Sequence, residues 1–370
     1  VVEAMLPYFT RYYGNASTIY ALGEESRKAV TRARDIIAAG IGAKPEEIYF
    51  TAGGSESDNW ALKATAEAYK EKGKHIITSK IEHHAILHTC EWLERQGFEV
   101  TYLDVDENGR INPADVEAAI RPDTILISIM FANNEIGTIE PIAEIGAIAR
   151  AHGVLFHTDA VQAFGQEPIQ VDEMNIDMLS SSGHKLNGPK GIGFLYIRKG
   201  VKIRSFVHGG AQERKRRAGT ENVPAIAGLG EAAEEIYENL DEKRAHLYGL
   251  KQRFIDGIEK LEGTHVNGKT GEDSAPHIVS VSFEGIRSEV LLHSLEDRGI
   301  YVSSGSACSS NNHAGKHKGS KTLRNIHLKE NLLDSTLRFS FSVHTTEEEI
   351  DYALEVLGEL LPVLKKYTRH

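Results

Sequence analysis

The sequence predicts an α/β protein with a large domain, whose mostly parallel sheet is flanked by helices, and a smaller α+β domain. From about residue 75, short β-like runs alternate with stretches whose apolar residues have helical spacing. Most of the β-like runs are apolar, which is typical of parallel strands that helices cover on both faces. The candidate strands span residues 75–79, 124–132, 154–160, 177–183 and 191–198.

The last third of the chain has a different pattern. A long helical stretch runs from about 223 to 262 and leads to a segment of strands and helices in mixed order. Its candidate elements are strands at 277–285, 300–304 and 337–342, a helix at 288–297 and a final helix from 346 onward. We therefore expect a large domain at residues 15–240 and a small domain made of residues 1–14 and 241–370.

Composition and charge argue against several classes of function. The chain has 370 residues and a formal charge of −11, which disfavours nucleic-acid binding because phosphate neutralisation needs a basic surface. The sequence contains no run of eighteen apolar residues that could span a membrane. Cys90 and Cys308 form neither a CxxC pair nor a zinc-ligand spacing, so a reducing cytoplasm is the expected setting.

A glycine-rich turn at residues 51–57, Thr-Ala-Gly-Gly-Ser-Glu-Ser, directly precedes a helical run. Backbone N–H groups converge at such a helix start, and phosphate is their usual ligand. The turn matches neither of the common nucleotide-binding glycine patterns. Helix capping by Ser55 or Ser57 is the alternative role.

Two further motifs follow candidate strands. Asp159, in HTDAVQ, can pair with a cofactor nitrogen or simply cap the next turn. Lys185, in SSSGHKLNGPKG, can act as a Schiff-base lysine or remain a solvated loop lysine. Together, a phosphate turn, an acid for a pyridine nitrogen and a lysine are what pyridoxal 5'-phosphate requires.

These motifs resemble those of cysteine desulfurases of the NifS/IscS type, within the class V family of pyridoxal-phosphate-dependent aminotransferases. The resemblance extends from YGNAS near residue 13 to TTEEEIDYAL near 354, which is nearly the whole chain. It implies a fold-type I enzyme with a mostly parallel seven-stranded sheet, and it implies a homodimer.

The resemblance also assigns roles to individual residues. Lys185 corresponds to the lysine that binds the cofactor covalently, Asp159 to the pyridine-nitrogen aspartate, and His83 to a catalytic histidine that stacks on the ring. Arg338 corresponds to the arginine that binds the substrate carboxylate, and Asn134 to an asparagine that contacts substrate and cofactor. The other cofactor positions are Gly54, Ser55, Ser182 and His184 for the phosphate, Gln162 for the phenolic oxygen, and Thr220 for the phosphate held by the partner subunit.

Cys308 identifies the subtype. It lies in SSGSACSSNNHAGKHKGSK, a polar loop in which a thiol can ionise and attack, whereas Cys90 in HTCEWL is expected in the core. In the resembling family, SGSAC carries the nucleophile that takes sulfur from bound L-cysteine, leaving a persulfide on the enzyme and releasing alanine. The long stretch between Cys308 and Arg338 matches the branch with an extended cysteine loop.

We expect the sulfur to pass to an acceptor protein, such as an iron–sulfur scaffold, with the basic stretch from His313 to Arg324 guiding it. A solvated flexible loop is the alternative for that stretch. The alternative activities are selenocysteine lyase, another class V aminotransferase reaction, and a non-catalytic scaffold. His84 and His88 have i, i+4 spacing, but no carboxylate partner or HExxH motif is evident, so no metal site is expected.

Overall fold

The computed structural model describes residues 1–304 and 320–366, which form two compact units. The first unit comprises Val1–Leu103, Asn112–Phe131 and Pro141–Leu240. The second comprises Asp104–Ile111, Ala132–Glu140 and the residues from Asp241 onward. No helix among the described residues has the length and apolar character needed to cross a membrane.

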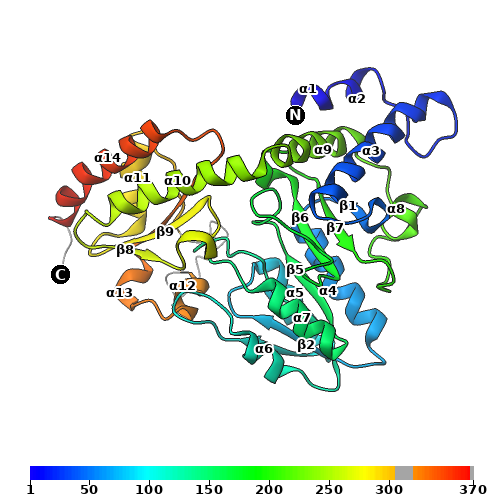
Figure 1. Cartoon of the computed structure of the whole chain (residues 1–370), viewed down its shortest axis with the longest axis horizontal. Helices are drawn as coiled ribbons and strands as arrows, with labels where there is room; N and C mark the ends of the chain where they lie inside the picture. The colour runs from blue at the N-terminus through cyan, green and yellow to red at the C-terminus, as the bar shows by residue number, and fades with distance from the viewer. Residues whose placement is uncertain (305–319, 367–370) are drawn as a thin grey trace. The chain divides into compact units, whose positions relative to one another are not determined.

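The first unit is built on a seven-stranded sheet in the order β1-β7-β6-β5-β4-β2-β3 (Figure 1). The strands from β2 to β6 run parallel to one another, while β7 is antiparallel to both β1 and β6. This sheet confirms the expected α/β fold. Its strands are β1 (Ile48–Thr51), β2 (His75–Ser79), β3 (Glu99–Leu103), β4 (Thr124–Ser128), β5 (Leu155–Asp159), β6 (Met178–Ser182) and β7 (Gly193–Ile197).

The direction of the strands determines which turns meet. Because β1 and β6 are both antiparallel to β7, β1 points the same way as the parallel strands. The C-terminal ends of β1, β2, β4, β5 and β6 therefore lie along one edge of the sheet. Ligands of parallel sheets bind at such an edge.

Helices pack against this sheet. On α4, Trp60 and Leu62 are fully buried in a core that includes Met178 of β6 and Leu195 of β7. Each such side chain contributes about 1.5–3 kcal/mol by burial. The helical segments of the unit are α1 (Val2–Met5), α2 (Pro7–Thr10), α3 (Ala21–Gly40), the 3-10 turn η1 (Pro45–Glu47), α4 (Gly54–Tyr69), α5 (His84–Arg95), α6 (Pro113–Ala119), α7 (Ile142–His152), η2 (Gly183–Leu186), α8 (Gln212–Lys215) and α9 (Val223–Tyr237).

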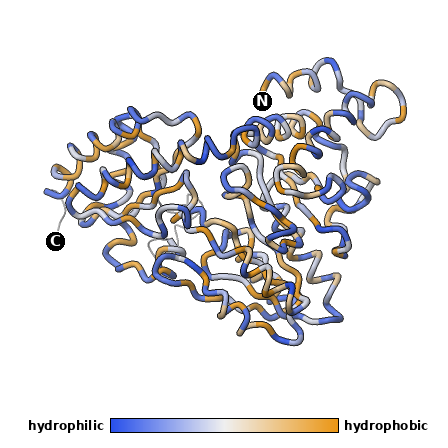
Figure 2. Tube along the Cα trace, viewed as in Figure 1, coloured by the Kyte–Doolittle hydropathy of each residue, from blue (hydrophilic) through white to orange (hydrophobic). Residues whose placement is uncertain are grey.

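The second unit has a three-stranded antiparallel sheet in the order β10-β9-β8. Phe254, Phe283 and Phe339 are buried together, with the rings of Phe254 and Phe339 centred 4.7 Å apart. The buried apolar residues of α14 recur every three or four positions, which places them on one face of the helix, and hydrophilic residues lie between them (Figure 2). The elements are α10 (Leu240–Ile258), β8 (Thr264–Asn267), η3 (Gly271–Asp273), β9 (Ile278–Phe283), α11 (Ser288–Glu296), α12 (Lys321–Asn325), α13 (Glu330–Leu333), β10 (Thr336–Ser340) and α14 (Glu347–Lys365).

The structure differs from the sequence-based expectation in several places. Residues 1–14 belong to the first unit, because α1 and α2 pack on α9. The expected strand at 300–304 is only a single bridge between Ser303 and Arg338. The helical stretch from 223 to 262 contains two helices, α9 and α10. The strands β1, β3 and β8 were not predicted, since β1 and β8 have four residues each and β3 is a partly exposed edge strand of mixed polarity.

Gly193 at the start of β7 allows the glycine turn before α4 to approach the sheet. A Cβ added there would lie 2.4 Å from the carbonyl oxygen of Ser181 and 2.8 Å from Cα of Gly53. We expect Gly193→Ala to reduce the free energy of unfolding by about 1–3 kcal/mol, because backbone atoms must move. Thermal unfolding measures this.

Gly249, in the middle of α10, is the matched control, because a Cβ added there meets no atom within 4 Å. Gly249→Ala should stabilise the protein by about 0.5–1 kcal/mol through helix propensity. Equal unfolding temperatures for the two variants would contradict the steric explanation.

Candidate active site

The turn that follows β1 forms the start of α4. Gly53 is the N-cap residue and has a φ of 145°, a conformation that favours glycine. A Cβ on Gly54 would lie 2.6 Å from Cγ2 of Val161, so the two turns are in close contact. Because a glycine occupies the N-cap, neither Ser55 nor Ser57 caps this helix. The N–H groups at the start of α4 are therefore not used by a cap side chain and remain suited to an anion.

Asp159 is the last residue of β5 and lies at the same edge. Its side chain is buried, with 5% of the residue exposed, and Oδ1 accepts a hydrogen bond of 3.0 Å from the N–H of Val161. Burial raises the pKa of Asp159, while its neighbours His83 and Lys185 act to lower that pKa. A ligand N–H or cation at this position would favour the carboxylate.

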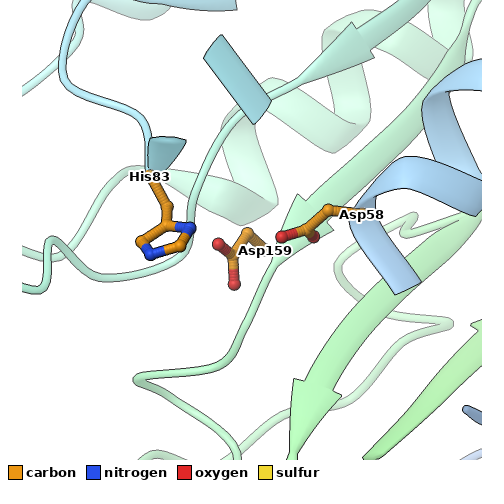
Figure 3. Close-up of side chains that lie close together, drawn as sticks. All are labelled: Asp58, His83 and Asp159. Carbon is orange, nitrogen blue, oxygen red and sulfur yellow. The ribbon is translucent and has the colours of Figure 1, made fainter. Parts of the chain in front are cut away.

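His83 follows β2 and is the N-cap residue of α5. Its Nδ1 accepts a hydrogen bond of 3.1 Å from the N–H of Ala85, which fixes the orientation of the ring. The ring lies beside the carboxylate of Asp159, and Asp58 of α4 completes a group in which one polar atom of each residue lies within 4.8 Å of the other two (Figure 3). The sheet thus brings together residues that are far apart in the sequence.

Asp58, His83 and Asp159 have the donor types of a metal site, and the sequence analysis did not consider this group. Nδ1 of His83 is already the acceptor for the Ala85 N–H, which leaves only Nε2 for a ligand. For His84 and His88, the rings stack with centroids 5.3 Å apart, and Nδ1 of His88 is 3.0 Å from Glu91. This carboxylate neighbour of His88 was not anticipated.

The turn after β6 carries the next expected residues. Ser182 is buried, and a Cβ on Gly53 would be 3.6 Å from its Oγ, so the hydroxyl borders the glycine turn. His184 is exposed and Lys185 is half-buried, both in η2. Gln162 is buried in the turn after β5. These four positions therefore lie at the end of β6 or on the turns that follow β5 and β6.

Thr220 is exposed and lines a cavity of about 210 Å³ together with Thr51, Ala52 and Arg217. Two contacts of 2.9 and 3.1 Å join the guanidinium of Arg217 to Glu56, in the first turn of α4. This ion pair connects the Thr220 segment to the glycine turn. The role expected for Thr220 in a homodimer remains a prediction.

The second unit contains Asn134 and Arg338. Nη1 of Arg338, on β10, donates a hydrogen bond of 2.8 Å to the carbonyl oxygen of Asn134. Its Nε is buried and has no hydrogen-bond partner among the described residues. Burial lowers the pKa of Arg338, although the guanidinium stays charged. An anion bound at Nε would compensate the buried donor.

Cys308 lies outside the described residues, and the described chain on either side of it contacts the Asn134–Arg338 region. Ser303 and Arg338 exchange two backbone hydrogen bonds of 2.7 and 3.1 Å. On the other side, the hydroxyl of Thr322 is 3.2 Å from Oε1 of Glu135. Cys90 is fully buried in the core of the first unit, and burial strongly raises the pKa of its thiol.

Sequence reasoning missed three buried groups of this cluster: Asp58 and Glu82, which interact with Asp159, and His157, which lies 3.8 Å from Asp58. Asp58 could have been noticed as an acid that shares a helix face with the apolar residues Ala61 and Leu62. Glu82 directly precedes His83, and burial raises its pKa to about 8.

These residues fit pyridoxal 5'-phosphate. The start of α4 and Ser182 suit the phosphate, Asp159 suits a protonated pyridine nitrogen, and Lys185 supplies an amine at the same edge of the sheet.

Comparison with known proteins agrees with this assignment. The family model for class-V aminotransferases matches residues 1–353. A protein of Methanosarcina thermophila named cysteine desulfurase IscS is 54% identical over 99% of this chain and 89% of its own length. A NifS-like protein of known structure has a TM-score of 0.91 and 38% identity over 98% of this chain and 95% of its own. The structure titled SspA in complex with cysteine has a TM-score of 0.81 and 38% identity over 93% and 95%.

The fold, the residues at the edge of its sheet and these similarities agree: the chain belongs to the class-V aminotransferase family, whose cofactor is pyridoxal 5'-phosphate.

Proposed function

We propose that this protein is a pyridoxal-phosphate-dependent cysteine desulfurase, which converts L-cysteine to L-alanine and holds the sulfur as a persulfide on Cys308. The observation that carries the proposal is the group formed by buried Asp159, His83 and the lysine turn at Lys185, beside the glycine turn of α4. The similarity to a relative named cysteine desulfurase and to a structure that contains cysteine supports the substrate.

The residues of the first unit have distinct tasks in this proposal. The bound cofactor supplies an electron sink for bond cleavage at the amino acid. Asp159 keeps the pyridine nitrogen protonated through its negative charge, and His83 stacks on the ring. Lys185 holds the cofactor covalently until substrate binds and then moves the proton of the substrate α-carbon. The phosphate is bound by Gly54, Ser55, Ser182 and His184, with Gln162 at the phenolic oxygen and Thr220 reaching the partner subunit's site.

Arg338 binds the substrate carboxylate, and Asn134 contributes a further contact. The buried Nε of Arg338 lacks a hydrogen-bond partner among the described residues, and Nη1 is held by Asn134. The edge of the guanidinium that carries Nε and Nη2 can donate a hydrogen bond to each oxygen of a carboxylate. This arrangement selects an amino acid as substrate and fixes its orientation.

Cys308 is the sulfur acceptor of the enzyme. Its thiolate attacks the sulfur of the bound cysteine, an S–S bond forms, and the Cβ–S bond breaks with its electron pair passing to carbon. Protonation of that carbon completes alanine, so cysteine and a thiol become alanine and a persulfide. Cys308 comes five positions after Ser303, which pairs with Arg338, so at most about 18 Å of chain joins the two residues.

A selenocysteine lyase or another class V aminotransferase is the alternative activity. The names of the relatives favour cysteine as substrate, and an aminotransferase has no need of the Cys308 thiol. A non-catalytic scaffold would not require Asp159, Lys185 and Arg338 together. Measuring alanine formed from cysteine, and comparing it with amino transfer to a keto acid, distinguishes these activities.

Cys308→Ala should still bind the cofactor and cysteine but release no sulfide, because the nucleophile that accepts the sulfur is absent. Visible absorbance of the bound cofactor before and after addition of L-cysteine checks binding, and sulfide and alanine assays check turnover. Normal desulfuration by this variant would remove Cys308 from the reaction.

Cys90→Ala is the matched control, since its thiol is buried in the core and remains protonated. We expect it to keep sulfide release at the wild-type rate, with a loss of stability of about 1–3 kcal/mol from the cavity. If this variant lost sulfide release while it still bound the cofactor, Cys90 would be needed for the reaction, and our assignment of the sulfur to Cys308 would be contradicted.

Arg338→Lys should raise the KM for L-cysteine by about tenfold or more, because lysine keeps the charge but loses the paired donors. The affinity for the cofactor should not change, since Arg338 binds only substrate. Steady-state kinetics and cofactor titration of the apoprotein measure the two quantities.

Arg253→Lys provides the control for this exchange. Arg253 lies on α10, is exposed, and pairs with Asp351 at 2.7 Å. The Arg253→Lys variant should leave the KM for L-cysteine unchanged. An unchanged KM in Arg338→Lys as well would show that the arginine does not bind the substrate carboxylate.

The finer points of assembly are part of the same proposal. We expect a homodimer, a reducing cytoplasm for the reactive thiol, and an acidic sulfur-acceptor protein such as an iron–sulfur scaffold. Of the basic stretch from His313 to Arg324, residues 313–319 lie outside the described residues, while Lys321 begins α12. A basic stretch on an acidic chain supports the choice of an acidic partner.

Replacing Lys316, Lys318 and Lys321 by Gln should slow sulfur transfer to an acidic scaffold protein about tenfold at low salt. Release of sulfide by a small neutral thiol reductant should be unaffected, because it needs no charge steering. The ratio of the two rates is the measurement.

Exchange of Lys70, Lys260 and Lys366, three exposed lysines elsewhere, provides a control with the same change in net charge. That variant should keep both rates. If the two triple variants slow transfer equally, only net charge matters and local guidance is excluded.

A further inference from the structure

Asp58 is a buried acid that the proposed reaction does not use. It lies on the second turn of α4, and only 1% of the residue is exposed. Its Oδ1 has no hydrogen-bond partner among the described residues. Figure 3 shows the carboxyl group directed toward Asp159, and one polar atom from each of the two acids and His83 lies within 4.8 Å of the other two.

A neutral histidine lies on the other side of Asp58. Nε2 of His157, on β5, is 3.8 Å from Oδ1 of Asp58. The two ring nitrogens are 2.8 Å from the hydroxyl of Ser128 and 2.9 Å from that of Ser180. Burial lowers the pKa of His157 to about 3, so the imidazole carries no charge that could pair with Asp58.

The charges around the two acids are unequal. Burial raises the pKa of Asp58 well above its usual value, and the neighbouring acids Asp159 and Glu82 raise it further, while a hydrogen bond with the Ser180 hydroxyl opposes this. Asp159 faces His83 and Lys185, both of which favour its charged form. Two adjacent buried carboxyls cannot both ionise without a large cost, so one proton stays on the pair.

We propose that Asp58 is a positioning residue for Asp159: it remains a neutral carboxylic acid in the working enzyme, so that the pair carries one negative charge and Asp159 holds it. This proposal deepens the proposed function and rests on it for the role of Asp159 toward the cofactor. Asp58 touches neither substrate nor cofactor in this proposal. Because Asp58 is uncharged, it places no second negative charge beside Asp159. Its polar side chain also fills the space next to the Asp159 carboxylate.

The protonation state can be measured without the reaction. Infrared spectroscopy distinguishes the carbonyl stretch of a protonated carboxyl from that of a carboxylate. For the purified holoenzyme at pH 7, we expect Asp58→Asn to remove one protonated-carboxyl band. Glu82→Gln should remove a second band that fades as pH rises through about 8, which separates the two groups.

Asp172→Asn is the matched control, because Asp172 is exposed and paired with Arg198. It should remove no protonated-carboxyl band. If Asp58→Asn also leaves these bands unchanged, Asp58 is ionised and the proposal is overturned. Because this readout does not depend on desulfuration, it separates a failure of this inference from a failure of the proposed function.

Cofactor binding tests the positioning role. Asn at position 58 is neutral and of the same size, so Asp58→Asn should keep the dissociation constant of pyridoxal 5'-phosphate within about twofold and keep the pH dependence of its visible spectrum. Asp58→Ala leaves a void beside Asp159, and the dissociation constant should rise about tenfold.

Each outcome decides between the two states of Asp58. If Asp58→Asn retains the affinity for pyridoxal 5'-phosphate and Asp58→Ala loses it, the proposal is supported, because a neutral side chain of the same size is then sufficient at this position. A shift of the spectral pH midpoint by about one unit or more in Asp58→Asn would mean that a negative charge had been removed, which overturns it. Unchanged affinity in Asp58→Ala overturns it as well.

Discussion

The parallel direction of the central strands is the constraint on which the candidate site depends. Because β1, β2, β5 and β6 end at the same edge, four turns from distant parts of the sequence meet there. The glycine turn after β1 begins α4, and His83 after β2 caps α5. Asp159 ends β5, and Lys185 lies in the turn after β6. The direction of the strands therefore places these side chains close together.

Burial then controls the charge of the groups that this edge assembles. Four titratable groups here are nearly inaccessible to solvent, and burial favours the neutral form of each. It raises the pKa of Asp58, Glu82 and Asp159 and lowers the pKa of His157. His83 and Lys185 act on Asp159 in the opposite direction, toward its charged form. The cluster therefore favours a negative charge on Asp159 over one on Asp58, which is the position of the charge in our proposal.

The second unit applies a related principle to an arginine. Arg338 is largely buried, one of its donors is held by the carbonyl of Asn134, and its Nε has no partner among the described residues. A buried donor of this kind is costly unless a ligand satisfies it. The backbone pairing of Ser303 with Arg338 and the contact of Thr322 with Glu135 place described residues from both sides of Cys308 in this same region.

The sequence by itself determined the fold class and five strands of the central sheet, and it predicted which residues at the edge of that sheet carry the chemistry that we propose. Those predictions rested on apolar runs, glycine turns and the order of motifs, which are local properties. The strands β1 and β3 and the placement of residues 1–14 needed the structure, since short or mixed-polarity segments acquire their state only from neighbours. Likewise, Asp58, Glu82 and His157 belong to ordinary local patterns. Only the tertiary structure decides that they surround Asp159, because burial and charge proximity arise from contacts between residues distant in sequence.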